Sequence, residues 1–476
     1  MTITEFQKIT RHLKDAIANS PFEGKTYVVG GAVRDFVRDA EIKDIDLVVN
    51  IEQGGIDLPN YLHRKGLLVG PPKIASSFGT ASWKLKAFPD ETIESVHTRA
   101  EDYIDRTSRN PQVRFGSLEE DAKRRDFTIN SIYYNVSTEN IWDSSMEGML
   151  DINFGFINCV DNPDIIFSDD PLRMLRAIRF SSVLGYHIST HTWQGIVKNA
   201  YRLQIIVPER IQTEFDKILL SPYASRGIQD LINSGLMDYI IPRVCIMKGL
   251  EQNKYHCADV LGHTLSVLTR CTTKDLTLRM AALLHDIGKT ATLTVDDKGV
   301  RHFYNHELES GQFAEYILKK LRYPKKFTDD VKQLVEHHMD TKQWGTNGEK
   351  VKPHNVRRLQ YDCKTPEQFN RLIELINADN ESHHPDYCLH QLESLTSMAN
   401  KLSMEGTSGY NYRPPIDGNE IKAILGEDCP PKAIGYTNKR LLRYCLSKDK
   451  LPTANDCRNY VKQNAKYFIE KHNQHN

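Results

Sequence analysis

Two acidic residues spaced two apart follow a glycine pair in the N-terminal part of the chain. The run Tyr27-Val28-Val29 ends in Gly30-Gly31-Ala32-Val33-Arg34-Asp35, and Asp44-Ile45-Asp46 comes shortly afterwards. On a strand, residues two apart point to the same face, so we expect Asp44 and Asp46 side by side. Carboxylates and substrate phosphates are the ligands that Mg²⁺ prefers. The pattern predicts a site where two ions activate a hydroxyl and support a leaving pyrophosphate.

Two further features extend this predicted site. Two glycines at the end of a strand let the backbone approach a ligand closely, and the next helix start presents free N–H groups to an anion. Gly30 and Gly31 are therefore predicted to cradle a triphosphate. Glu94, in the β-like run Thr92-Ile93-Glu94-Ser95-Val96, is expected to supply a third carboxylate. A solvated edge strand would explain a bare Asp-x-Asp pair but not its coupling to the glycine turn.

A basic segment follows at Asp121-Ala122-Lys123-Arg124-Arg125-Asp126-Phe127-Thr128-Ile129-Asn130, which we interpret as a helix start. The planar fork of arginine suits bidentate contact with phosphate. We therefore predict that these arginines hold a triphosphate or a sugar and that Asp126 orients one of them. A charged helix face in solvent is the alternative.

A third segment, Asp169-Asp170-Pro171-Leu172-Arg173-Met174-Leu175-Arg176-Ala177-Ile178-Arg179-Phe180, reads as a helix with proline in its first turn. Asp170 and Arg173 are three apart, which predicts that they share a face. An acceptor beside an arginine fork can read the hydrogen-bonding edge of a base. The alternative is a capping aspartate in a weak ion pair. Leu172, Leu175 and Phe180 are expected in the core.

Histidines and aspartates recur in the helical second half of the chain. They are His263, His285, Asp286, His306, the pair His337-His338, and Asp379. Imidazoles and carboxylates together suit a divalent transition metal, and a shared aspartate can bridge two ions. A metal-bound water can hydrolyse a phosphoester. The set predicts a metal site, whereas a lone histidine on a helix is usually structural.

Elements that position these residues can be read from periodicity. Residues 1–20 predict a helix, residues 27–29 and 45–49 predict strands, and residues 80–98 predict two more. The polar stretch 99–118 reads as a loop, with Arg99 and Arg106 as weak additions to the basic site. Beyond about residue 160 the pattern is helical, and 405–418 is the most linker-like stretch. The fold class is therefore α+β, with a small sheet-and-helix head and a long all-α body.

Composition bounds the remaining possibilities. A chain of 476 residues suggests two to four domains, and no apolar run is long enough for a membrane helix. Nine scattered cysteines without a CxxC pair, and no signal-peptide pattern, predict a cytoplasmic protein. Lys+Arg and Asp+Glu are both 62, which disfavours indiscriminate binding of long nucleic acids but allows a local basic groove.

Three segments in this order resemble the class II tRNA nucleotidyltransferases, the CCA-adding enzymes, to which bacterial poly(A) polymerases are close relatives. The motifs are GGAVRD with DID, RRDFTIN and DDPLRMLRAIRF. The resemblance implies a DNA polymerase β-like head over 1–155 and a helical neck and body over 156–250. The His-Asp set resembles an HD domain, placed over 251–390, and 391–476 would be a tail that contacts tRNA, with Lys439, Arg440 and Arg443 as a basic cluster.

The resemblance also implies residue roles. Asp44 and Asp46 would bind Mg²⁺, with Glu94 as the third catalytic carboxylate, while Asp170 and Arg173 would pair with the base of CTP or ATP. The implied nucleotide-binding set is Gly30, Gly31, Arg34, Asp121, Arg124, Arg125, Asp126, Asn130, Asp170, Arg173, Arg176 and Arg179. The implied HD metal ligands are His263, His285, Asp286, His306, His338 and Asp379; His338 is chosen over its neighbour because the family has His before Met.

The expected activity is addition of C, C and A to the 3′ end of tRNA from CTP and ATP without a nucleic-acid template. Alternatives are an enzyme that adds only CC or only A, and a poly(A) polymerase. Poly(A) polymerases usually carry a basic C-terminal extension and lack the His-Asp set. The balanced charge and the His-Asp residues between 263 and 379 therefore favour tRNA as the substrate. Two other classes are a phosphohydrolase with a nucleotide-binding head and a non-catalytic RNA-binding protein. Both predict a damaged carboxylate pair, whereas Asp44 and Asp46 are both present. The oligomeric state is not predicted.

Overall fold

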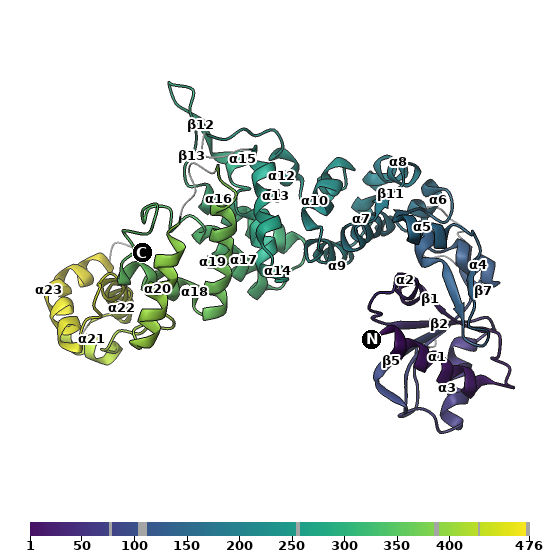
Figure 1. Cartoon of the computed structure of the whole chain (residues 1–476). Coiled ribbons are helices and arrows are strands. Elements are labelled where there is room, and N and C mark those ends of the chain that lie inside the picture. The colour runs from purple at the N-terminus through teal and green to yellow at the C-terminus, as the bar shows by residue number, and fades with distance from the viewer. Residues whose placement is uncertain (76–78, 103–111, 254–257, 385–389, 427–428, 473–476) are drawn as a thin grey trace. The chain divides into compact units, whose positions relative to one another are not determined.

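The computed structural model describes residues 1–75, 79–102, 112–253, 258–384, 390–426 and 429–472. Two compact units make up the chain, Met1–Ile240 and Ile241–Asn476, coloured purple to teal and teal to yellow in Figure 1. The four-part division expected from the sequence is finer than these two units and stays a prediction.

A mixed sheet lies in the N-terminal part of the first unit (Figure 1). β2 and β5 are parallel, while the other neighbouring pairs are antiparallel. The connection between the parallel strands includes α3 (Gly54–Arg64). In spatial order the strands are β3 (Lys73–Ala75), β4 (Thr80–Leu85), β5 (Phe88–His97), β2 (Ile45–Val49), β1 (Thr26–Val29), β8 (Ile132–Asn135) and β9 (Ile141–Asp143).

Helices cover both faces of this sheet. On one face α1 (Ile3–Ile17) buries Phe6, Ile9 and Leu13 at helical spacing, and the Phe6 ring packs 5.6 Å from that of Tyr134. On the other face α4 (Leu118–Lys123) packs beside Tyr133, the neighbouring residue of β8, because successive strand residues point to opposite faces. The predicted N-terminal helix and strands are confirmed, and α2 (Gly31–Val37) follows the glycine pair.

The prediction of a loop over 99–118 is wrong at both ends. β6 (Arg99–Asp102) pairs with β7 (Gln112–Phe115), and α4 begins at Leu118. The polar ends of the stretch complete each other's backbone hydrogen bonds as an antiparallel ribbon, which composition does not reveal. Residues 103–111, with Arg106, lie outside the described residues.

The rest of the first unit is mainly helical. Its core includes Leu172, Leu175 and Phe180 of α7, as expected. The two-stranded sheet of β10 (Phe156–Ile157) and β11 (His187–Ile188) is parallel. The remaining elements are α5 (Gly148–Phe154), α6 (Pro163–Asp169), α7 (Leu172–Leu184), α8 (Thr190–Asn199), α9 (Pro208–Leu219), α10 (Ala224–Asn233), α11 (Met237–Ile240) and the 3₁₀ turns Thr128–Asn130 and Ala200–Ile205.

In the second unit α13, α17 and α19 pack against α14, whose side chains are almost all buried. A hairpin of β12 (Leu293–Val295) and β13 (Arg301–Phe303) precedes α16. The helices are α12 (Pro242–Ile246), α13 (Val260–Arg270), α14 (Leu276–Leu284), α15 (Lys289–Thr292), α16 (His306–Lys320), α17 (Lys325–His337), α18 (Pro353–Cys363), α19 (Pro366–Asn380), α20 (Leu392–Met404), α21 (Gly418–Leu425), α22 (Pro431–Leu446) and α23 (Ala454–His472).

The stretch 405–418 is not a free linker, contrary to the expectation. Buried Arg357 of α18 donates Nε–H to the Thr407 carbonyl at 2.9 Å, and Ile416 lies in the core of the last three helices. Arg357 also donates to the Lys448 carbonyl at 2.8 Å. These contacts tie the stretch to α18 and to the last three helices.

Candidate active site

The predicted carboxylates gather on one face of the sheet. Asp46 of β2 pairs in register with Glu94 of β5, and both side chains are exposed. Partial desolvation, followed by repulsion from Glu94 and Asp44, raises the pKa of Asp46. Like charges that oppose one another's ionisation are relieved by a cation, so this residue set fits a divalent metal.

The glycine turn brings the first two motifs together. Gly30 has a φ of +69°, a conformation that favours glycine, and a Cβ there would lie 3.8 Å from Nη1 of Arg125. Arg34 is buried and donates to both oxygens of Asp35 and, at 2.9 Å, to Oδ1 of Asn130. Arg34 and Asn130 therefore fix the turn to the second motif and do not face open solvent.

Asp121 holds the two neighbouring arginines in place. Its fully buried carboxylate accepts hydrogen bonds from Arg124 at 2.9 Å, Arg125 at 3.0 Å and the Tyr133 hydroxyl at 2.7 Å. Burial alone would raise the pKa of Asp121, but the charges of Arg125 and Arg124 outweigh it and lower the pKa to about 2. The two arginines lie after the end of α4 and not at a helix start, which corrects the expectation.

Asp126 is the corresponding anchor for the third motif. It is buried, accepts a hydrogen bond from Asn130 at 3.1 Å, and forms an ion pair with Arg176 at 2.6 Å. Burial raises its pKa and the charge of Arg176 lowers it, with a net lowering. Both oxygens are thus occupied by protein groups, which assigns Asp126 to positioning.

Helical spacing does not relate Asp170 to Arg173, because Asp170 lies before the helix that carries Arg173. Asp170 lies between α6 and α7 in an extended conformation, and its carboxylate accepts from the Leu172 amide at 3.1 Å and from Arg210 at 2.7 Å. Helical spacing fails because Pro171 starts the helix after Asp170. Of the alternative, the capping contact is found, but the ion pair is with Arg210 and not with Arg173.

Arg173 points back toward the second motif. Its Nη2 donates to the Arg124 carbonyl at 2.7 Å, whereas its buried Nη1 has no hydrogen-bond partner in the part of the chain described. A buried guanidinium N–H without a partner is costly, so a ligand acceptor there would be stabilising. Arg179, in the same helix, forms an ion pair with Glu214 at 2.6 Å and stacks on Phe180.

Sequence reasoning missed several residues of this site. Tyr133 and the α9 residues Arg210 and Glu214 each hold a predicted site residue. Arg210 and Glu214 are four apart on a helix, a spacing that places them on one face and that was a usable signal. Tyr133 gave no such signal.

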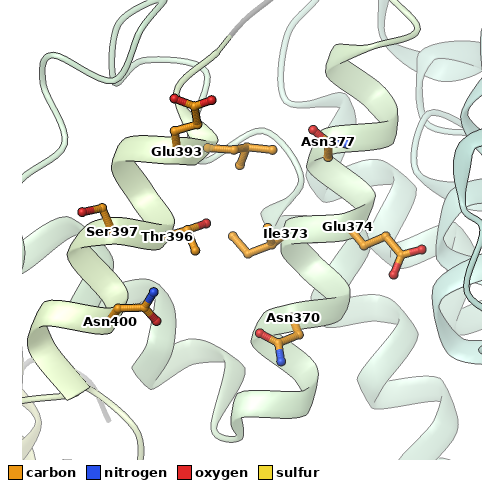
Figure 2. A pocket seen from close by; sticks show the side chains of 9 residues that line it. Asn370, Ile373, Glu374, Asn377, Glu393, Thr396, Ser397 and Asn400 are labelled. Carbon is orange, nitrogen blue, oxygen red and sulfur yellow. The ribbon is translucent and has the colours of Figure 1, made fainter. Parts of the chain in front are cut away.

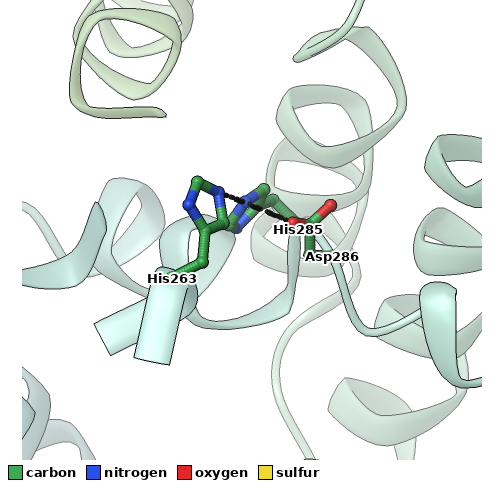
Figure 3. A group of neighbouring side chains, drawn as sticks. All are labelled: His263, His285 and Asp286. Atoms are coloured by element: carbon green, nitrogen blue, oxygen red, sulfur yellow. Dashed lines mark hydrogen bonds and ion pairs between the residues drawn. The ribbon is translucent and has the colours of Figure 1, made fainter. Parts of the chain in front are cut away.

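The His-Asp set converges in the second unit. Nε2 of His285 lies 3.2 Å from Oδ2 of Asp286, and Nε2 of His263 lies 3.6 Å from the same oxygen (Figure 3). On the other carboxylate oxygen, Oδ1, Nε2 of His306 lies at 3.2 Å and Nε2 of His338 at 3.8 Å. Asp286 thus stands between two histidine pairs, as a bridging ligand would.

Hydrogen bonds set the histidine tautomers. Nδ1 of His285, His306 and His338 each lies within bonding distance of a carbonyl three residues earlier, at 2.9, 2.8 and 2.6 Å. Donation through Nδ1 leaves the Nε2 lone pair for a metal, the usual outer-shell arrangement. His337 instead bonds Asp340, so the choice of His338 agrees with the geometry.

Asp379 and two lysines complete the cluster. Oδ1 of Asp379 lies 3.0 Å from Nε2 of His263, and its Oδ2 lies 2.8 Å from Nζ of Lys342. Lys289 binds Asp286 at 2.7 Å. Each buried carboxylate therefore has a lysine counter-charge, which the sequence analysis did not anticipate. The donor set fits one or two divalent metals.

A separate groove of about 830 Å³ lies between α19 and α20 (Figure 2). Thr396 and Ile373 face each other across it, and amide and carboxylate side chains line its ends. None of the predicted site residues lines this groove. It therefore belongs to neither candidate site.

The fold and the two clusters define a nucleotidyltransferase head joined to a helical body with a histidine-aspartate domain. The family model for the poly A polymerase head domain matches residues 26–158, the probable RNA- and SrmB-binding site of polymerase A matches 185–247, and the HD domain matches 255–369.

Similar proteins cover most of the chain. An A-adding tRNA nucleotidyltransferase of Deinococcus radiodurans is 28% identical over 85% of this chain and 88% of its own length. Poly(A) polymerase I of Salmonella typhimurium is 30% identical over 71% of this chain and 74% of its own length. The solved structure of the Bacillus stearothermophilus CCA-adding enzyme with CTP shares the fold, with a TM-score of 0.69, 20% identity, and coverage of 98% of this chain and 99% of that one.

The chain belongs to the tRNA nucleotidyltransferase and poly(A) polymerase family. The expected fold class, with its head and HD domain, is confirmed. No helix in the described ranges is both long and apolar enough to span a bilayer.

Proposed function

We propose that the chain adds C, C and A to the 3′ end of tRNA from CTP and ATP. The observation that carries the proposal is the carboxylate row of Asp46 and Glu94, which lies on the face of the sheet where Arg125 meets the Gly30 turn. Acids for a metal, cations for phosphates and a glycine turn thus occur together. This is the arrangement that phosphoryl transfer requires.

In the proposed reaction, the RNA 3′-hydroxyl oxygen bonds to the α-phosphorus of the nucleotide. The bond from that phosphorus to the oxygen bridging the α- and β-phosphates breaks, pyrophosphate leaves with that oxygen, and the hydroxyl proton passes to water. Asp44, Asp46 and Glu94 would hold Mg²⁺, which supplies charge neutralisation when bound. Arg124 and Arg125, held by Asp121, would contact the phosphates and ribose.

Base selection is proposed for Arg173 and Asp170. The buried Nη1 of Arg173 offers a donor without a protein partner in the described residues, and Asp170 offers a partly exposed carboxylate. Together they supply the donor and acceptor that a base edge needs. Arg210 holds Asp170, so we assign Arg210 to positioning.

Partial activity is the nearest alternative, because the relative from Deinococcus radiodurans is an A-adding enzyme. Poly(A) synthesis is a further alternative, and the balanced charge and the intact His-Asp cluster favour tRNA over it. Extension of tRNA transcripts ending before CCA, after C and after CC tests all of these. Products ending at CCA support the proposal, and a long A ladder contradicts it.

A second activity, metal-dependent phosphoester hydrolysis, is proposed for the His-Asp cluster. The bridging position of Asp286 between two histidine pairs favours it. His263, His285, Asp286, His306, His338 and Asp379 would hold the metal, which would supply an activated water. Metal content measured on purified protein, with phosphatase and 2′,3′-cyclic phosphodiesterase assays, tests this proposal. Protein that binds no divalent transition metal contradicts it.

A further inference from the structure

A cavity of about 650 Å³ opens on the head, away from the residues assigned above. It is lined by Tyr27 of β1, Trp142 of β9, and the segment Phe115–Leu118 at the start of α4. Tyr27 pairs in register with Val48, and Val29 pairs with Asp46. The cavity therefore begins one side-chain row along the same face of the sheet that carries the carboxylates. We call it the Trp142 pocket.

The lining of the Trp142 pocket is rich in aromatic rings and amides, and its described residues include no cation. Tyr27, Phe115 and Trp142 provide ring surfaces, and the side chain of Phe115 is exposed. Amide side chains come from Asn50, Asn135 and Asn140. Among the described lining residues there is no lysine, arginine or histidine, and Glu119 is the one acid. A phosphate would find no counter-charge here, whereas a planar uncharged heterocycle would stack and form hydrogen bonds.

Some of the pocket's polar groups are already committed to the fold. Asn135 accepts from the amides of Ser137 at 2.9 Å and Thr138 at 3.0 Å and donates to the Gly24 carbonyl at 3.0 Å. Asn135 therefore shapes the pocket. By contrast, no side-chain hydrogen bond of Asn140 or of the Trp142 indole N–H occurs within the ranges described. These two groups supply a donor and a donor-acceptor amide, which match the edge of a nucleobase.

The pocket is connected to the arginine pair through one ring. Trp142 packs edge-on against Tyr133, with 5.2 Å between the ring centroids. The Tyr133 hydroxyl donates to Asp121 at 2.7 Å and accepts from Nε of Arg125 at 2.8 Å. A base stacked on Trp142 would therefore contact a ring that itself packs on Tyr133, the residue that binds Arg125.

We propose that the Trp142 pocket binds one unpaired nucleobase, outside the site of nucleotide addition. The base can come from a free nucleoside or from an unpaired nucleotide of the RNA substrate. The second source rests on the proposed function, because it requires that RNA be bound. The described lining of this pocket has no cationic side chain, unlike the predicted triphosphate site with Arg124 and Arg125. A nucleoside without phosphates is therefore the appropriate probe.

Photocrosslinking tests the proposal on the full-length protein. One arm uses 8-azidoadenosine and the other uses a tRNA transcript containing 4-thiouridine, with crosslinked peptides mapped by mass spectrometry. Crosslinks to peptides that contain Tyr27, Phe115 or Trp142 support the pocket, and the arm that yields them identifies the source of the base. Crosslinks from both arms that map entirely elsewhere overturn the proposal.

Two variants sharpen the result. Trp142→Phe keeps a ring against Tyr133 but removes the indole N–H, and Asn140→Ala removes an exposed amide. The protein that carries both changes loses two hydrogen bonds, which should weaken adenosine binding, or raise KM for tRNA, by about 5–30-fold. The exposed Asn438→Ala in α22 is the matched control. Equal affinity for adenosine in the wild type, the pocket variants and the control overturns the proposal. Crosslinking detects binding in the pocket even if the protein adds no nucleotide. Failure of the proposed function is therefore a separate outcome.

Discussion

Asp46 and Glu94 lie directly opposite each other on the parallel strands β2 and β5, with both carboxylates on the exposed part of one sheet face. They are far apart in the sequence, with α3, β3 and β4 between them, and they meet because β2 and β5 pair side by side. Partial desolvation raises the pKa of Asp46, and repulsion from Glu94 and Asp44 raises it further. The two carboxylates therefore concentrate negative charge where a bound cation would be stabilised.

Replacing either carboxylate by its amide should abolish catalysis and spare binding. Glu94→Gln and Asp46→Asn keep the shape but remove the charge that would hold Mg²⁺, so nucleotide addition should fall by at least about 10²-fold. Incorporation of labelled CMP and AMP measures the loss, and tRNA binding is measured on the same samples. Glu91→Gln, on the same strand β5, is the control and should retain activity. Full activity of Glu94→Gln would remove it from the metal site.

Asp121 gives a prediction about pH. Its pKa in the folded chain is about 2, below the ordinary value, so its charge stabilises the fold above about pH 4 and this contribution disappears as the pH falls toward 2. The wild type should lose roughly 2 kcal/mol of unfolding free energy over that range through this group. Asp121→Asn should lack this part of the pH dependence and should raise KM for CTP, because Arg124 and Arg125 lose their anchor.

Urea unfolding between pH 2 and pH 7 measures this difference. The exposed Asp57→Asn of α3 is the matched control and should follow the wild type at every pH. If Asp121→Asn shows the same pH dependence as the wild type, the charged contact with the two arginines does not stabilise the fold.

Arg173 should decide which base is accepted. Arg173→Ala removes the buried donor, so the preference for CTP and ATP over UTP and GTP should fall by about 10–100-fold in kcat/KM. Arg210→Ala should have a smaller effect in the same direction, because it frees Asp170 without removing it. Single-nucleotide addition with each of the four triphosphates measures the ratios. Arg202→Ala, outside this cluster, is the control, and an unchanged ratio in Arg173→Ala rejects the base-reading role.

Substitution of single ligands in the His-Asp cluster should reduce the amount of bound metal, and substitution of Asp286 should reduce it most. His338→Ala removes a ligand on the Oδ1 side of Asp286 and His263→Ala one on the Oδ2 side, so each should lower the bound metal without eliminating it. Asp286→Ala removes the bridge and should eliminate binding. Elemental analysis after loading with Mn²⁺ measures the stoichiometry. The exposed His191→Ala is the control, and equal metal content in Asp286→Ala and wild type contradicts the bridging role.

The sequence was informative where a motif is local. The glycine turn and the strand position of Asp46 were predicted because glycine conformation and strand period act over a few residues, whereas Asp44 lies just before β2. The His-Asp ligands were also predicted, although their approach depends on helix packing. Helical spacing was wrongly applied to Asp170 and Arg173, because the sequence alone does not show that α7 begins after Asp170. Anchors such as Tyr133, Arg210 and Lys342 were missed, since long-range contacts decide their partners.

The most direct test of the central claim is extension of tRNA transcripts that end before CCA, after C and after CC. Purified protein is incubated with Mg²⁺ and with CTP and ATP, singly and together, and products are resolved at single-nucleotide length. The account predicts that all three transcripts become a product ending in CCA and that extension then stops. Addition of A alone to the CC end, a long A ladder, or no extension would contradict it.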